Sequence, residues 1–103
     1  MKYLITESQL DKVIFRYLNN RDFIQIDIND SIFFFNSEND EYAQIRYDKD
    51  DGWCGIRYTL IDEICSFFSL QESDSEIVIG RWVENTLQMN VVGTYENELM
   101  SID

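Results

Sequence analysis

Carboxylates are the side chains of this sequence best suited to chemistry, because it has 20 acidic residues, eight basic residues and no histidine. Three acidic pairs are close enough in sequence to suggest a general acid and base: Asp40 with Glu41, Asp62 with Glu63, and Asp74 with Glu76. Such catalysis needs one carboxyl group desolvated beside a cleft. The pairs instead fall on polar loops or at helix starts, where acidic residues favour the helix dipole. They therefore predict surface charge rather than a hydrolytic dyad.

The segment Asp48–Gly52 begins like a calcium-binding loop. Gly52 falls at the fifth loop position instead of the sixth, and Thr59 stands where the bidentate glutamate belongs. We therefore expect a hairpin turn there, made possible by the positive φ that Gly52 accepts. The missing histidine also removes the usual activator of a nucleophile. The sequence thus predicts no catalytic residue, no metal ligand and no cofactor, and a divalent-metal-dependent hydrolase is the least favoured function.

Cys54 and Cys65 are the two cysteines, and they form no C-x-x-C or Cys/His cluster. We expect both to be buried, reduced thiols. The sequence has no secretory leader pattern and no apolar run near the roughly 20 residues of a membrane span. These features predict a cytoplasmic protein.

The net charge of −12 at pH 7 argues against direct contact with nucleic acid or an anionic membrane, and for a basic protein partner. After Arg57, Arg81 is the only basic residue, so the second half of the chain should present a continuous negative potential. Mimicry of DNA is less favoured, because the acids are interspersed along the chain. The alternative is that the acids only keep an aromatic-rich domain soluble.

The length of 103 residues and the 45% hydrophobic content predict one domain, residues 1–103. The capping box Thr6-x-x-Gln9 and the apolar residues at helical spacing that follow predict an N-terminal helix ending at Asn19-Asn20. Alternation then predicts strands over 24–28 and 42–48. Two more strands are expected, Ile32–Phe35, which is apolar on both faces, and Trp53–Tyr58.

Helical spacing returns over 60–68, and a second capping box, Ser73-x-x-Glu76, predicts a helix through about Gln88. Its expected inner face consists of Ile79, Trp82, Val83, Thr86 and Leu87. β-Branched residues favour a final edge strand over 90–95, with the remaining residues frayed. The prediction is an α+β domain: an N-terminal helix, a four-stranded antiparallel meander, two C-terminal helices packed on one sheet face, and the edge strand.

The opening Ile5-Thr6-Glu7-Ser8-Gln9-Leu10 resembles the start of small uncharacterised proteins of tailed bacteriophages. The resemblance covers some ten residues. It implies a phage or phage-derived context, in which small acidic proteins are commonly virion components or inhibitors of host defence.

The leading hypothesis is a non-enzymatic protein-binding module that docks a basic partner, such as a host defence nuclease or a toxin. The expected acidic contacts are Asp62, Glu63, Glu72, Asp74, Glu76 and Glu84. The expected aromatic anchors are Trp53, Phe33 and Phe35, with core packing as the alternative for each. A virion structural or assembly component is the second hypothesis; it would form a homo-oligomer through the 33–35 strand or the terminal strand.

Overall fold

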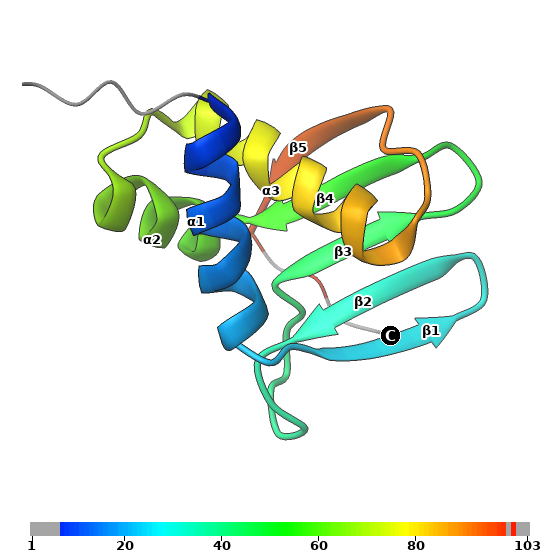
Figure 1. The fold of residues 1–103 in the computed structure, drawn as a ribbon. Coiled ribbons are helices and arrows are strands. Elements are labelled where there is room, and N and C mark those ends of the chain that lie inside the picture. The colour runs from blue at the N-terminus through cyan, green and yellow to red at the C-terminus, as the bar shows by residue number, and fades with distance from the viewer. Residues whose placement is uncertain (1–6, 99, 101–103) are drawn as a thin grey trace, which may run out of the picture.

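The computed structural model describes residues 7–98 and residue 100, and it places three helices on one face of a five-stranded sheet (Figure 1). The elements in chain order are α1 (Glu7–Asn20), β1 (Ile24–Ile28), β2 (Ser31–Phe35), β3 (Ile45–Asp48), β4 (Trp53–Arg57), α2 (Tyr58–Phe68), α3 (Glu72–Leu87) and β5 (Gly93–Asn97). The predicted α+β class and element order are confirmed. Thr6, the expected cap of α1, lies outside the described residues.

The sheet has the order β1-β2-β3-β4-β5, and its first four strands form the predicted antiparallel meander. Strand β5 is the predicted edge strand, and it runs parallel to β4. A parallel neighbour needs a crossover connection, because a tight turn reverses the chain direction. Helices α2 and α3 supply that crossover and thereby cover the sheet.

Strand β2 is buried on both faces, so of the two roles open to its apolar sequence, a covered strand or an aromatic surface for a partner, the structure has the covered strand. Ile32 and Phe34 point toward the helices, whereas Phe33 and Phe35 point to the far face. On the helix side, the ring of Phe34 lies 5.4 Å from that of Trp82 on α3. The main core comprises the following buried residues: Ile14, Leu18, Ile32, Phe34, Ile45, Tyr47, Cys54, Ile56, Leu60, Ile61, Ile64, Val78, Ile79, Trp82 and Val83.

A second, smaller apolar cluster lies on the far face of the sheet, where Phe33 and Phe35 pack with Ala43 and Met100. The isoleucines of β1 flank this cluster. The backbone N–H of Ala43 donates to the carbonyl of Met100, with an N···O distance of 2.6 Å. The expectation that the last residues are frayed is therefore wrong for Met100, which is buried.

Several predicted boundaries shift by a few residues. Strand β3 begins at Ile45, and the backbone N–H of Ala43, within the strand range expected from the sequence, bonds to the carbonyl of Met100 instead of to a neighbouring strand. Strand β4 ends at Arg57, the residue before α2. Strand β5 is displaced to 93–97, because residues 90–92 form a loop tied to other elements.

The second capping box is wrong, because α3 begins at Glu72 and Ser73 lies within its first turn. Gln71 occupies the N-cap position without a side-chain cap hydrogen bond. Ser75 is fully buried, with its hydroxyl 3.1 Å from the sulfur of Cys65 on α2, so tertiary packing supports this end of the helix. The inner face is as predicted for Ile79, Trp82 and Val83, whereas Thr86 is exposed.

Two phenylalanine truncations test the position of the core. We expect Phe34→Ala to lower the free energy of unfolding by about 3–5 kcal/mol, because Phe34 is 1% exposed and contacts Trp82. The control, Phe67→Ala, removes a ring that is 66% exposed and should cost about 1 kcal/mol or less. Urea denaturation measures both, and equal losses would contradict this core.

Candidate functional site

Helix α3 carries the candidate site on its exposed side, while its other side enters the core. Glu72 and Asp74 in its first turn complement the helix dipole, and Gln88, with a φ of 56°, ends it in the left-handed conformation. The buried side comprises Ser75, Val78, Ile79, Gly80, Trp82 and Val83. The charged and apolar side chains between these positions consequently face solvent.

Arg81 lies at the middle of this exposed side and binds Asp11 of α1 through two contacts. Its Nε lies 2.8 Å from Oδ2 of Asp11, and its Nη2 donates to Oδ1 at 3.0 Å. The Nη2 contact is a charge-assisted hydrogen bond, and the second carboxylate oxygen lies within ion-pair distance of Nε. The pair joins two helices that are 70 residues apart in sequence, and it neutralises the cation of α3.

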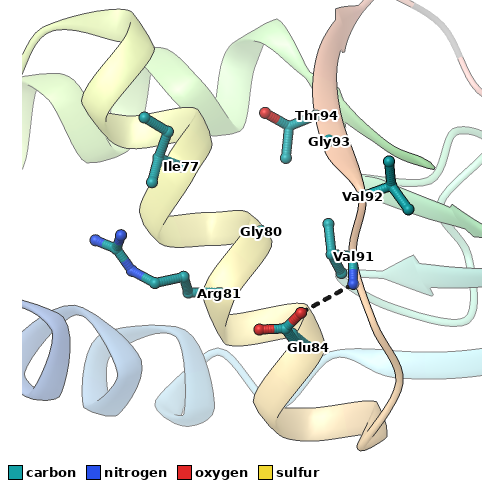
Figure 2. A pocket seen from close by; sticks show the side chains of 8 residues that line it. All are labelled: Ile77, Gly80, Arg81, Glu84, Val91, Val92, Gly93 and Thr94. Atoms are coloured by element: carbon teal, nitrogen blue, oxygen red, sulfur yellow. Dashed lines mark hydrogen bonds between the residues drawn. The ribbon is translucent and has the colours of Figure 1, made fainter. Parts of the chain in front are cut away.

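Among the described residues, Arg81 lines three hollows. The first has a volume of about 200 Å³ and lies between α3 and the chain entering β5; it is lined by Ile77, Gly80, Arg81, Glu84, Val91, Val92, Gly93 and Thr94 (Figure 2). Two broader hollows, of about 320 and 420 Å³, lie between α3 and α1. Asp11 lines both of these, and Asp74 lines the 320 Å³ hollow.

The first hollow depends on a close approach of α3 to β5 at Gly80. A Cβ atom at Gly80 would lie 2.7 Å from Cγ2 of Thr94, which is closer than van der Waals contact permits. One turn further along α3, the carboxylate of Glu84 accepts a hydrogen bond from the backbone N–H of Val91 at 3.0 Å (Figure 2). The close packing of α3 on β5 therefore requires glycine at position 80, and the Glu84 hydrogen bond holds the loop over residues 90–92 against α3.

The acids of α3 dominate the charge of this surface. In the described part of the chain, no ion pair involves Glu72, Asp74, Glu76 or Glu84. Partial burial raises the pKa of Glu76, and the nearby carboxylates of Glu96 and Glu72 raise it further. Within the described residues these acids thus form a negative field without a paired cation, and Glu84 lies at the edge of the first hollow.

The structure separates the predicted contact residues into three regions: α3, α2 and the sheet. Glu72, Asp74, Glu76 and Glu84 lie together along α3, whereas Asp62 and Glu63 lie on α2. Asp62 is exposed, but Glu63 is partly buried, accepts a hydrogen bond from Tyr17 of α1 and forms an ion pair with Arg21, the residue after α1. The Glu63 hydrogen bond is also the main cause of a raised pKa at Tyr17.

The predicted aromatic anchors lie on the sheet, away from the acids of α3. Trp53 is 41% exposed and packs beside Tyr95, so it remains available at the surface. Phe33 and Phe35 pack against Ala43 and Met100, and each is at most 5% exposed. Core packing therefore replaces the surface role expected for these two phenylalanines.

Sequence reasoning did not find the Arg81–Asp11 pair or the hollow beside Gly80. A sequence signal existed for each feature. Arg81 is the only basic residue after Arg57, and a glycine inside a helical pattern indicates close packing against a neighbour. Neither signal identifies the residue that Arg81 or Gly80 contacts, because Asp11 and Thr94 belong to other elements of the fold.

The other sequence-derived expectations concern cysteines, metals and membranes. Both cysteines are unpaired; Cys54 is buried, and burial together with Asp48 raises its pKa to about 12, whereas Cys65 is only partly buried. Asp48–Gly52 forms the predicted turn, with a φ of 77° at Gly52. Over residues 7–98 and 100, no three acidic, cysteine or histidine side chains converge to hold a metal ion. No described helix is long and apolar enough to cross a membrane.

Comparison of the chain with protein-family models, with curated proteins and with solved structures finds no match.

A glycine substitution tests the close approach of α3 to β5. Alanine normally stabilises a helix interior by about 1 kcal/mol relative to glycine. We expect Gly80→Ala instead to lower the free energy of unfolding by about 1–3 kcal/mol, because the new Cβ meets Cγ2 of Thr94. In a Thr94→Ser background, which lacks that methyl group, the loss should shrink. A double-mutant cycle by urea denaturation measures it, and additive losses would refute the contact.

The raised pKa of Glu76 predicts a pH-dependent effect of neutralising it. The folded protein binds this proton more tightly than the unfolded chain does, so stability falls as pH rises from 4.5 through the folded pKa. We expect Glu76→Gln to raise the melting temperature at pH 7 and to lose this advantage as the pH falls below 4.5. The matched control is Glu38→Gln at an exposed loop position. An equal gain for both variants would indicate a general charge effect.

Proposed function

We propose that this protein is a small acidic, non-enzymatic binding module that docks a basic protein partner through the exposed side of α3. We define this α3 surface by Glu72, Asp74, Glu76, Ile77, Arg81 and Glu84. The observation that carries the proposal is the placement, beside an apolar hollow, of carboxylates that form no ion pair within the described part of the chain. A nuclease or toxin with a basic surface is the kind of partner that fits, and the resemblance to phage proteins is compatible with that role.

The local arrangement supports a docking role better than a purely solubilising one. Solubility requires only that acids be spread over the surface. Here Arg81 is held by Asp11, which leaves the acids of α3 without a neutralising cation in the described part of the chain. Ile77 is 49% exposed and lines one hollow together with Glu84 and another together with Asp74, and an exposed apolar side chain beside charged ones is typical of an interface.

Charge reversal at two positions of α3 tests the proposed function. The variant Glu72→Lys/Asp74→Lys changes the net charge from −12 to −8, since each reversal adds two charges. The control Glu38→Lys/Glu41→Lys makes the same change at exposed residues of the β2–β3 loop. We expect a basic protein from the source cell lysate to be retained by the wild type and the control, but not by the α3 variant. High salt should release it.

Mass spectrometry of the retained proteins, and a melting curve for each variant, complete the measurement. Equal retention by the two variants would show that the α3 surface is not the docking site. Salt-independent retention would reject the electrostatic mechanism. Recovery of the chain itself, or of capsid and tail proteins, would favour the alternative of a virion structural or assembly component.

A further inference from the structure

The hollow between α3 and β5 has a size and a lining that suit one side chain. Its volume is about 200 Å³, which is below the roughly 300–1,000 Å³ of typical small-molecule sites. A cavity of about 150 Å³ already holds a benzene molecule. Ile77 and Val92, which are 49% and 61% exposed, stand on opposite sides of it, and Gly80 leaves space between them (Figure 2).

The wall of this hollow opposite α3 is held in place before any partner binds. The loop over residues 90–92 is tied at three points: the Tyr47 hydroxyl donates to the carbonyl of Asn90 at 2.8 Å, the Val91 N–H donates to Glu84, and the Val92 N–H donates to the carbonyl of Gly52 at 2.8 Å. A preformed wall lowers the ordering cost of binding. The hollow is consequently a pre-organised receptor.

Charge around the hollow selects the kind of chain that can enter it. Glu84 stands at its edge, and Asp74 and Glu76 lie on the same helix. Arg81 also lines the hollow, but its guanidinium extends toward α1, where Asp11 binds it (Figure 2). An acidic segment would be repelled, whereas lysine or arginine on either side of the inserted residue would meet carboxylates.

We propose that the hollow receives a single aliphatic side chain from a basic segment of the partner, with flanking cationic side chains placed over the acids of α3. This inference rests on the proposed function and adds the recognition element: an aliphatic residue between basic residues. The inserted side chain supplies buried apolar contact, and the cations supply orientation and salt dependence. A purely charged partner surface would use the acids but leave the hollow empty.

Three synthetic peptides test this inference. The first is a short lysine-rich peptide with one central leucine, the second replaces that leucine by alanine, and the third replaces every lysine by glutamate. Each is titrated into isotopically labelled protein, with NMR shifts followed at Gly80, Val92 and Thr94 and, separately, at Glu72 and Asp74. We expect the leucine peptide to bind about tenfold or more tightly than the alanine peptide, from the apolar area that leucine adds.

Two variants locate the leucine discrimination on the protein. We expect Ile77→Ser to remove most of the difference between the leucine and alanine peptides, because Ile77 lines the hollow. The control, Val13→Ser, changes a residue of α1 that is 51% exposed and is not part of the hollow's lining; it should keep the difference. Both variants alter one exposed aliphatic residue, so melting curves should show similar folding.

The outcomes separate this inference from the proposed function. Equal binding of the leucine and alanine peptides, with shifts confined to Glu72 and Asp74, would overturn the side-chain inference and leave basic-partner docking intact. Binding of the glutamate peptide as tightly as the lysine peptides would overturn the role of charge in both. Absence of binding by both lysine peptides at low salt would reject the proposed function and the inference with it.

Discussion

Trp82 of α3 packs its ring against Phe34 of β2 and Phe23 before β1, and this contact sets how α3 lies on the sheet. The indole N–H also donates to the side-chain oxygen of Asn19 at 2.9 Å, so the same residue links α3 to the end of α1. Because cores are closely packed, α3 cannot rotate about its axis without losing these contacts. Its exposed residues are consequently fixed in direction by a buried aromatic cluster.

The same constraint explains why the candidate surface has hollows. Gly80 permits α3 to approach β5 closely, whereas Arg81, the next residue, points toward α1 and is bound by Asp11. Space remains on each side of the helix, and the loop over 90–92 closes the space toward β5. The surface geometry is thus a consequence of core packing and of one ion pair between helices.

Charge pairing then decides which side chains of this surface carry an uncompensated charge. Within the described residues, Arg21, Arg46, Lys49 and Arg81 each pair with an acid on another segment or on their own strand. The acids at the start of α3 instead stabilise the helix dipole while remaining open to solvent. Their local role in the helix and the proposed role in docking are compatible, because a dipole contact does not cancel the field toward a partner.

Local pattern in the sequence was sufficient for most of the elements. Alternation identified β1, an uninterrupted apolar run identified β2, and helical spacing identified the three helices, since these patterns follow from backbone geometry. It did not locate the start of α3 or of β5, because Ser75 and the loop over 90–92 are held by contacts with distant elements. The net charge and the acidic residues later found on α3 likewise follow directly from the sequence.

Which of those acids lie on the same surface was decided only by tertiary structure. The sequence alone determined the acidity, the α+β order and the candidate residues Glu72, Asp74, Glu76 and Glu84. Folding removed Glu63 from the set by pairing it with Arg21, and it buried Phe33 and Phe35. Folding also brought Asp11 to Arg81 and Thr94 to Gly80. Such pairings depend on how helices and strands pack. The spacing of residues along the chain does not determine the distance in space between residues of different elements.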